Sequence, residues 1–270
     1  MKITIITVSY NSDRTINDTI KSVLKQSYAD IEYIIIDGNS QDKTLDIIKS
    51  YQADFNGRLK YISEPDKGIY DAMNKGINLS SGDLIGILNS DDMYLNKNSI
   101  KEVVTQIIKT NTDSIYTDLI IVDQFNSSKI IRTCTYSKFK LGMFSNGWHP
   151  PHPTFFVKKE IYNKYGVFDL AFKISSDFDF MMRILEVNSI STTYLPLKTI
   201  QMRNGGLSTS SLKNIFLSQK ECLESFKKNN IEIKFFSYFL NKYFHKILQY
   251  NIEGLLSDLF SKIFKKKFKS

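Results

Sequence analysis

The stretch Ile3-Thr4-Ile5-Ile6-Thr7-Val8-Ser9-Tyr10 decides the fold class, because it is β-rich, largely apolar and stops at a polar break, Asn11-Ser12-Asp13. Such a run is typical of a strand buried on both faces in a parallel sheet. Residues 15–26 then carry apolar side chains at helical spacing, and a second β-rich run follows at 33–36. Strand, helix and strand in this order predict a right-handed βαβ unit.

The same alternation extends beyond this unit. It predicts a helix over 44–51, a strand over 59–62, a helix over 70–79 and a strand over 84–88. More irregular β-structure is expected at 115–122 and 129–135, a helix at 175–187, and helices rich in Phe, Tyr and Lys from about residue 212. We therefore expect an α/β fold with a Rossmann-like, mostly parallel sheet flanked by helices and a C-terminal helical appendage.

Length and composition agree with an enzyme-sized globular chain. The 270 residues are 42% hydrophobic, enough for a sizeable core, which argues against disorder or a fibrous repeat. No run approaches the roughly 18 apolar residues of a membrane-spanning helix, and the first residues lack a signal-peptide cleavage site, so a cytoplasmic protein is expected. Cys134 and Cys222 predict buried thiols rather than a disulfide or metal pair.

The net charge of +8 is concentrated near the C-terminus. Residues 213–270 contain 12 lysines against 5 acidic residues, which leaves the rest of the chain nearly neutral. A nucleic-acid-binding domain would carry its basic residues across the main fold, so no nucleic-acid partner is expected. Apolar stripes over 239–263, ending in Lys265-Lys266-Lys267, predict a basic amphipathic region. It would rest on anionic lipid, or pack on the main domain or on a second copy in a homodimer.

Three predicted strands end in acidic loops, at Asp37, near Asp66 and at Asp91-Asp92. Ligands of open α/β sheets bind in the crevice outside the carboxyl ends of the strands. Carboxylates also suit hard cations such as Mg²⁺ or Mn²⁺. The alternative for Asp91-Asp92 is a helix N-cap, because Asp is favoured there.

Seven segments carry a resemblance. They are Thr7–Asn11, Ile36–Asp42, Glu64–Gly76, Leu88–Asp92, His152–Phe156, Ile174–Asp179 and Gly205–Ser208. In this order they resemble the motifs of family 2 glycosyltransferases with the GT-A fold, from residue 1 to about 208. The last three resemble the subgroup that builds bacterial surface polysaccharides of the O-antigen, capsule and colanic-acid type.

The resemblance implies an activity and a division of the chain. Residues 1–212 would form the catalytic domain, with a nucleotide-sugar-binding half over 1–110 and an acceptor-binding half over 111–212, followed by the basic helical region 213–270. The enzyme would move one sugar, with inversion, from a nucleotide-diphosphate sugar, expected to be a UDP-sugar, to a glycan hydroxyl. It would use Mn²⁺ or Mg²⁺, and a lipid-linked acceptor would place it at the inner face of the cytoplasmic membrane.

The resemblance also implies a set of donor-site residues, namely Thr7, Ser9, Tyr10, Asn11, Asp37, Asn39, Asp66, Lys67, Gly68, Asn74, Ser90, Asp91 and His152. Asp37 would bind the nucleobase and Asp66 would line the same pocket. Asp91 would be the last acid of the metal-binding Asp-x-Asp motif, in which Asn89 replaces the first acid and Asp92 compensates. Because Met73 stands where relatives often have Arg, the diphosphate contact is expected from Lys75 or Lys67.

Asp177 falls on the Asp of the family's Glu-Asp pair, with Ser176 in the Glu position. The implied role is the general base that takes a proton from the acceptor hydroxyl. The alternative is an N-cap for the following helix, and Asp179 is the second candidate for the base. His149 and His152 could contact a phosphate or metal, or be structural.

Several alternatives stay open. Trp148 could stack on a sugar or pack in the core, and Gly205-Gly206-Leu207-Ser208 could close over the donor or form a turn. The segment 201–204 departs from the Gln-x-x-Arg-Trp motif of processive synthases, which favours single transfers. A nucleotidyltransferase or a dinucleotide-dependent oxidoreductase would have a glycine-rich loop after the first strand, which is absent. A non-catalytic sugar-nucleotide-binding protein is the alternative of another class.

Overall fold

The computed structural model describes residues 1–206 and 211–249. Its elements are β1 (Ile3–Ser9), α1 (Ile16–Leu24), β2 (Ile31–Asp37), α2 (Thr44–Ser50), β3 (Leu59–Ser63), α3 (Ile69–Leu79), β4 (Leu84–Ile87), β5 (Met93–Tyr94), α4 (Ser99–Thr110), β6 (Ser114–Val122), β7 (Ile130–Cys134), the 3₁₀ turns η1 (Phe144–Asn146) and η2 (His152–Thr154), β8 (Phe156–Lys158), α5 (Lys159–Tyr165), α6 (Ser176–Met182), the π-helical turn η3 (Arg183–Val187), β9 (Thr192–Arg203), α7 (Leu212–Lys228) and α8 (Phe235–Leu248). The predicted alternation of strands and helices over residues 3–88 is confirmed.

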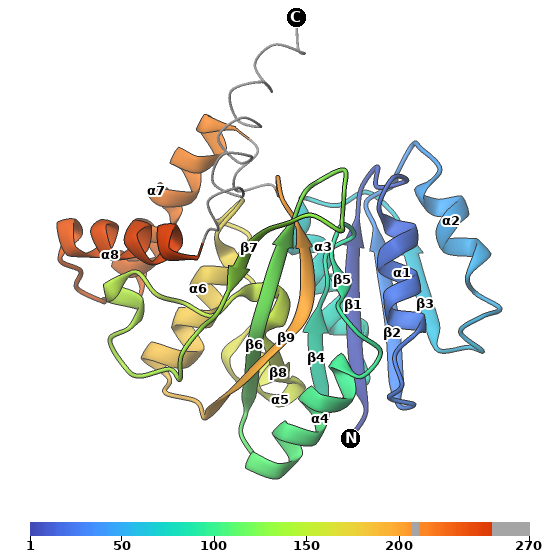
Figure 1. Ribbon diagram of the computed structural model, residues 1–270, viewed down its shortest axis with the longest axis horizontal. Helices are drawn as coiled ribbons and strands as arrows, with labels where there is room; N and C mark the ends of the chain where they lie inside the picture. The colour runs from blue at the N-terminus through green and yellow to red at the C-terminus, as the bar shows by residue number, and fades with distance from the viewer. Residues whose placement is uncertain (207–210, 250–270) are drawn as a thin grey trace, which may run out of the picture.

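The strands form one mixed sheet in the order β3-β2-β1-β4-β8-β6-β9-β5, with β7 paired to β6 (Figure 1). Strands β3, β2, β1 and β4 run parallel, as expected of βαβ units. A mostly parallel sheet was expected, but the parallel part ends at β8. This strand is antiparallel to both β4 and β6, whereas β6 and β9 are again parallel. The fold is thus an α/β fold whose sheet is parallel in its N-terminal half and mixed in its C-terminal half.

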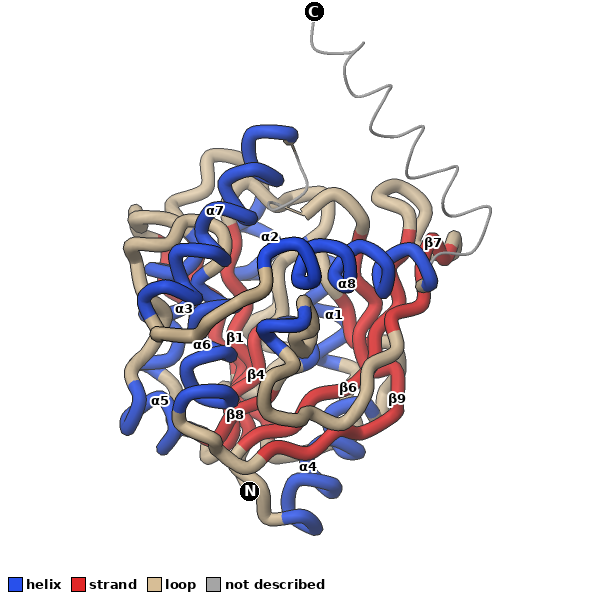
Figure 2. Tube along the Cα trace, turned by 90° about the vertical axis from the view of Figure 1, so that its left-hand side faces the viewer, coloured by secondary structure: helices blue, strands red, loops and turns tan. Residues whose placement is uncertain are grey.

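Helices cover both faces of the sheet (Figures 1 and 2). One apolar core lies between the sheet and α1, α2 and α4, and a second contains side chains of α3, α5, α6, α7 and α8. In β1 the two faces follow from strand alternation, because Ile3 and Ile5 belong to the first core while Ile6 and Val8 belong to the second. Burial on both faces explains why this strand is almost continuously apolar.

The register of the parallel strands gathers their carboxyl ends at one edge. Ser9 pairs with Asp37, and Asp37 pairs with Ser63, so β1, β2 and β3 all end at the same level. The loops that follow these strands therefore start side by side. This is the edge at which open α/β sheets bind ligands.

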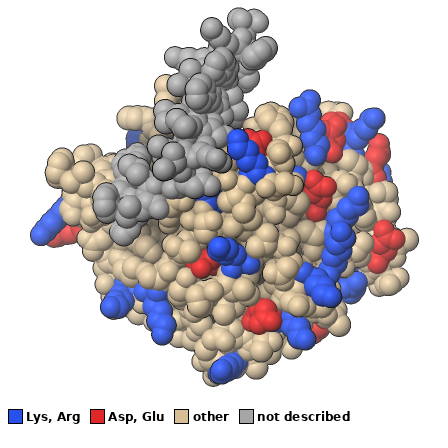
Figure 3. Space-filling model, viewed as in Figure 1, with Lys and Arg blue, Asp and Glu red and all other residues tan. Residues whose placement is uncertain are grey.

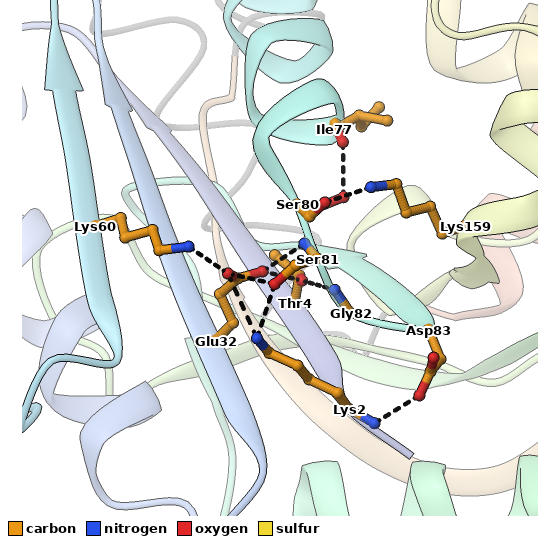
Figure 4. A network of polar contacts seen from close by, with 10 residues as sticks. All are labelled: Lys2, Thr4, Glu32, Lys60, Ile77, Ser80, Ser81, Gly82, Asp83 and Lys159. Atoms are coloured by element: carbon orange, nitrogen blue, oxygen red, sulfur yellow. Dashed lines mark hydrogen bonds and ion pairs between the residues drawn. The ribbon is translucent and has the colours of Figure 1, made fainter.

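The opposite edge of the sheet carries a buried acidic residue, Glu32 of β2 (Figure 4). Its carboxylate accepts hydrogen bonds from Thr4 Oγ1 at 2.6 Å, Lys60 Nζ at 2.8 Å and the Ser81 backbone N–H at 2.7 Å. Burial acts to raise the pKa of Glu32, but the hydrogen bonds from Lys60, Thr4 and Ser81 outweigh it and lower that pKa to about 2. This network ties β1, β3 and the turn before β4 to β2.

The C-terminal helices expected from the sequence are present as α7 and α8, and they pack on the second core. Cys222 and Phe226 of α7 and Tyr238 of α8 are buried there. Cys134 and Cys222 are both buried, and neither forms a disulfide. The predicted apolar stripe beyond residue 250 and Lys265-Lys266-Lys267 lie outside the described residues.

No helix within residues 1–206 and 211–249 is both long enough and apolar enough to cross a membrane. Basic and acidic side chains are interspersed on the face seen in Figure 3. This distribution matches the nearly neutral charge of the first 212 residues.

Candidate functional site

Hydrogen bonds join the loops that follow β1, β2 and β4. The Asn11 backbone N–H donates to Ser40 Oγ at 2.8 Å, and the Gln41 backbone N–H donates to Asn11 Oδ1 at 2.9 Å. The hydroxyl groups of Ser12 and Ser90 are hydrogen-bonded at 2.9 Å. These three loops therefore form one continuous rim at the carboxyl edge of the sheet.

A polar cleft of about 330 Å³ opens in this rim, lined by Tyr10, Gly38, Asn39, Gln41, Pro65 and Asp66. Tyr10 lines the cleft and is 64% exposed, so its ring is accessible to a ligand. Asp66 Oδ1 accepts a hydrogen bond from the Gly68 backbone N–H at 2.8 Å. A carboxylate, an aromatic ring and amide groups around one cleft can recognise a nucleobase and ribose by stacking and hydrogen bonding.

Asp37 lies beneath the cleft and is fully buried. Its carboxylate accepts hydrogen bonds from Ser9 Oγ at 3.1 Å, Ser63 Oγ at 2.6 Å and the Ser40 backbone N–H at 3.0 Å. Ser9, another predicted donor-site residue, is therefore bonded to Asp37 from the neighbouring strand. The Asp37 side chain thus holds the ends of β1, β2 and β3 together, and Asp37, predicted to bind the nucleobase, does not itself line the cleft.

Asn11 and Asn39 adopt the left-handed backbone conformation, with φ of 48° and 63°. Asn tolerates this conformation better than most other residues because its short amide forms local hydrogen bonds. The sharp turns of the rim therefore explain why residues 11 and 39 are asparagine. Asn39 also lines the cleft.

Two predicted donor-site residues lie inside the protein. Thr7 is fully buried, and its hydroxyl accepts a hydrogen bond from Tyr33 Oη at 3.1 Å. Asn74 of α3 donates to the Phe168 carbonyl at 2.8 Å and accepts from the Phe168 N–H at 3.0 Å. The structure therefore does not place these two side chains in the cleft, and Asn74 instead fastens α3 to the segment before α6.

The turn after β4 carries two carboxyl groups, one of them deeply buried. Burial raises the pKa of Asp91, and burial followed by the Asp91 charge raises the pKa of Asp92 well above its usual range. Asn89 Nδ2 donates to Asp92 Oδ2 at 3.1 Å. The other oxygens of these two side chains, Asn89 Oδ1 and Asp92 Oδ1, are buried and accept no hydrogen bond from the described residues.

This donor set fits a divalent cation. Buried oxygens without a hydrogen-bond donor are satisfied by ordered water or by a cation, and carboxylate and amide oxygens are the ligands that Mg²⁺ and Mn²⁺ prefer. The described part of the chain contains no cluster of three or more His, Cys, Asp or Glu residues, so the diphosphate would complete the coordination. Because α4 begins at Ser99 with Asn98 at its N-cap, neither Asp91 nor Asp92 caps that helix.

Arg203, at the end of β9, is a cation that the sequence analysis did not assign to the site. It is 7% exposed, donates to the Asp91 carbonyl at 3.0 Å and forms an ion pair with Asp18 at 2.6 Å. In the sequence, the only feature that could have pointed to Arg203 as a site residue was its position within the segment 201–204. Lys75, one of the two predicted diphosphate contacts, pairs with Glu64 at 2.7 Å, whereas the other, Lys67, is exposed at the α3 end of the rim.

Asp177 lies in the first turn of α6, and its Oδ1 accepts a hydrogen bond from Tyr70 Oη at 2.8 Å. The N-cap of α6 is Ser175, so Asp177 does not have that role. Asp179 is fully buried and accepts hydrogen bonds from Ser225 at 2.7 Å and Asn229 at 3.0 Å, which fixes α7 onto α6. Of the two candidates for a base, only Asp177 is partly accessible.

His149 and His152 lie near Asp177. Burial lowers the pKa of both imidazoles, while the Asp177 charge acts in the opposite direction. His152 packs edge-on against Phe168, with ring centroids 5.7 Å apart. Both rings therefore favour the neutral form, which can donate or accept one hydrogen bond at each nitrogen.

Trp148 belongs to an aromatic cluster, in contact with the rings of Tyr116, Tyr136, Phe139 and Phe144. The structure thus favours the core-packing alternative for this residue. Of the segment Gly205-Gly206-Leu207-Ser208, the last two residues lie outside the described part of the chain.

Comparison with known proteins shows which family the sequence matches. The sequence model described as "Glycosyl transferase family 2" matches residues 4–166, more than half of the chain. A PGL/p-HBAD biosynthesis glycosyltransferase of Mycobacterium bovis is 25% identical over 205 residues, covering 74% of this chain and 76% of the relative. An uncharacterised glycosyltransferase of Mycobacterium tuberculosis is 31% identical over 187 residues, covering 67% of this chain and 68% of the relative.

Solved structures share the fold. S. aureus TarS 1-349 in complex with UDP-GlcNAc superposes with a TM-score of 0.63 at 18% identity, covering 86% of this chain and 68% of that one. The mannosyltransferase PcManGT from Pyrobaculum calidifontis, in complex with GDP-Man and Mn²⁺, gives a TM-score of 0.63 at 14% identity and covers 84% and 63%. Against a longer TarS chain, the match spans 41% of that protein.

Proposed function

Because the chain belongs to glycosyl transferase family 2 and is thus a nucleotide-sugar-dependent glycosyltransferase, we propose that it transfers a single sugar, with inversion, from a UDP-sugar to a glycan hydroxyl. The observation that carries this proposal is the continuous rim of hydrogen-bonded loops around the 330 Å³ cleft. Tyr10 and Asp66 in the cleft, and the Asp91-Asp92 turn at the same edge of the sheet, support a nucleoside diphosphate as the ligand.

The choice of UDP is supported by a structural neighbour, TarS, which was solved with UDP and with UDP-GlcNAc. PcManGT, solved with GDP-Man and Mn²⁺, makes GDP the main competitor. The orphan oxygens of Asn89 and Asp92 support a divalent cation beside Asp91. When bound, Mn²⁺ or Mg²⁺ would supply positive charge to the leaving diphosphate.

The proposed chemistry needs one base. An acceptor hydroxyl oxygen attacks the anomeric carbon, the bond from that carbon to the diphosphate oxygen breaks, and its electron pair leaves with the nucleoside diphosphate. The hydroxyl proton passes to Asp177. No described residue donates a hydrogen bond to Asp177 Oδ2, which leaves this oxygen for the acceptor. His152, beside Asp177, is proposed to contact the donor.

We propose a lipid-linked acceptor for a bacterial surface glycan, at the inner face of the cytoplasmic membrane. Five large apolar side chains on α7 and α8 are exposed, namely Leu212, Phe216, Phe235, Phe236 and Leu240. Exposed lysines such as Lys213 and Lys220 accompany them on α7. Aromatic and basic side chains together favour the surface of an anionic membrane.

Calorimetric titration with UDP, GDP, CDP and dTDP, each with and without Mn²⁺, tests the donor site. We expect UDP to bind at least tenfold more tightly with Mn²⁺ than without it. Failure of every nucleotide to bind would contradict the proposed donor site.

The base is tested separately with Asp177→Asn. We expect this variant to keep the UDP affinity within about twofold and to lose transfer by at least a hundredfold. Retention of most of the activity would exclude Asp177 as the base. UDP binding by the wild type without transfer to any acceptor would favour the non-catalytic alternative.

A further inference from the structure

Tyr70 belongs to the segment Glu64–Gly76, but the resemblance gave it no role. It lies in the first turn of α3, two residues after Gly68 at the rim of the cleft. Its ring is buried, and its hydroxyl oxygen lies 2.8 Å from Asp177 Oδ1 and 2.6 Å from the Ile174 carbonyl oxygen. The residue thus links the donor side of the site to the carboxylate proposed as the base.

The two contacts of the Tyr70 hydroxyl cannot both be full hydrogen bonds while Asp177 is ionised. A phenol has one proton, and both the carboxylate and the carbonyl only accept. The acceptor proton arrives on Asp177 Oδ2, so the carboxyl group then turns about its Cβ–Cγ bond and its O–H donates to the Tyr70 oxygen. The Tyr70 proton is then free to bond the Ile174 carbonyl, and every group in the trio is satisfied.

We propose that Tyr70 is a positioning residue for Asp177. The Tyr70 hydroxyl donates to the ionised carboxylate before sugar transfer, and it donates to the Ile174 carbonyl once Asp177 has accepted the proton. This proposal rests on the proposed function, because it needs Asp177 to be the base. The Tyr70 hydroxyl and the Asp177 carboxyl group rotate, and the proton that Asp177 holds comes from the acceptor. The base is therefore hydrogen-bonded in both of its protonation states.

The frame that fixes the Ile174 carbonyl comes from α7. Glu221 is 4% exposed, and its carboxylate accepts the backbone N–H groups of Lys173, Ile174 and Ser175, each at 2.9 Å. On the other side the Tyr70 ring packs on Phe168, with centroids 5.5 Å apart. The carbonyl and the phenol are therefore held by separate elements, and rotation of the hydroxyl and carboxyl groups can exchange the hydrogen bonds without backbone movement.

The titratable groups around Asp177 and Tyr70 come from four parts of the fold. They are Tyr70 of α3, His149 and His152 at and before η2, Glu221 and Cys222 of α7, and Lys242 of α8, whose charge acts on His149 and Cys222. Burial, followed by the Asp177 charge, raises the pKa of Tyr70 well above its usual range. Tyr70 therefore keeps its proton throughout the pH range of an assay.

The test is Tyr70→Phe, which removes the hydroxyl and keeps the ring. Without this donor the Asp177 carboxylate is no longer held in one orientation towards the acceptor. We expect kcat to fall about tenfold. The UDP affinity should stay within about twofold.

The matched control is Tyr194→Phe, because Tyr194 Oη donates to Asp118 Oδ1 at the same distance, 2.8 Å, within the sheet. This variant should leave kcat unchanged. If Tyr70→Phe fails to fold, 3-fluorotyrosine incorporated at position 70 keeps the shape and makes a stronger donor, which withdraws charge from the Asp177 carboxylate, so kcat should fall at least twofold with the UDP affinity unchanged.

The role of Tyr70 would be refuted, and the proposed base left intact, by an unchanged kcat in Tyr70→Phe or in the fluorinated protein with Asp177→Asn inactive. An active Asp177→Asn would overturn the proposed base first, and the role of Tyr70 with it. Equal losses of kcat in Tyr70→Phe and Tyr194→Phe would show a general structural effect and also refute the proposal.

Discussion

Gly38 leaves room for the Asp66 carboxylate beside the candidate cleft. A Cβ at this position would lie 2.5 Å from Asp66 Oδ2, closer than side-chain atoms normally approach. Any side chain at residue 38 would therefore require the Asp66 carboxylate to move.

The variant Gly38→Ala should accordingly displace Asp66 and weaken UDP binding by about tenfold, with little loss of stability because the site is at the surface. Calorimetry with UDP and thermal unfolding would measure the two effects. An unchanged affinity would mean that Asp66 does not contact the nucleotide.

Asp91 is the residue whose charge should matter most to the metal. Asp91→Asn replaces a carboxylate oxygen by a neutral one, so the gain in UDP affinity on adding Mn²⁺ should fall by tenfold or more. Because burial raises the pKa of Asp91, the gain in the wild type should also shrink as the pH is lowered. Titrations at pH 7.5 and 5.5 test both statements, and a gain equal to the wild type in Asp91→Asn would exclude it as a ligand.

Individual residues were predictable where the motif itself forms the surface. Tyr10, Asn39 and Asp66 were expected in the donor site and do line the cleft. Tyr70 and Arg203 could not be found in the same way, because their partners are 107 and 112 positions away in the chain. Only the packing of α3 on α6, and of β9 beside the turn after β4, creates these contacts.

Among the elements, β2 carries the most acid-sensitive contact of the sheet, the Glu32 network. The pKa of Glu32 in the folded protein, about 2, lies below its ordinary value of 4.5. The network therefore stabilises the fold fully above pH 4.5, and this stabilisation is lost as the pH falls towards 2.

The loss should be on the order of 2 kcal/mol, and Glu32→Gln should show a smaller decrease in stability between pH 6 and pH 3 than the wild type. Urea unfolding at both pH values measures it. Glu224→Gln, at an exposed site on α7, is the control and should behave as the wild type. Equal acid sensitivity in Glu32→Gln and the wild type would rule the network out as the cause.

The helices and strands of the N-terminal half were predictable because their periodicity is strong and each lies between polar breaks. The direction of β8 was not, since a run of three residues at Phe156–Lys158 carries no period and its antiparallel pairing depends on β4 and β6. The role of α7 was also hidden. Helices rich in Phe, Tyr and Lys were expected from about residue 212, but nothing local shows that Glu221 accepts three N–H groups of the segment before α6.

For the molecule as a whole, the exposed aromatic side chains of α7 and α8 predict binding to anionic vesicles. Phe216 and Phe236 are 75% and 76% exposed, so replacing both by Ser should not destabilise the fold. We expect the double variant to bind vesicles of anionic lipid at least fivefold more weakly than the wild type, in a flotation assay.

The matched control is Phe125→Ser, since Phe125 is 86% exposed in the turn between β6 and β7. Equal losses in both variants would mean that any exposed phenylalanine contributes, and no loss in either would refute the membrane contact.

The whole architecture was predictable to the level of an α/β fold with terminal helices, because the charge and the apolar pattern change together near residue 212. The mixed C-terminal half of the sheet was not, since strand order beyond β4 depends on contacts between distant segments.

The hydrogen bonds that Glu221 accepts from the backbone N–H groups of residues 173–175 have a consequence for biosynthesis. Chains emerge from the ribosome N-terminus first, so the nucleotide cleft, built from residues 10–66, can form long before α7 exists. The carboxylate proposed to activate the acceptor gains its supporting frame only when residue 221 has been made. The segments that line the candidate cleft and the support of the proposed base are therefore made at different stages of translation.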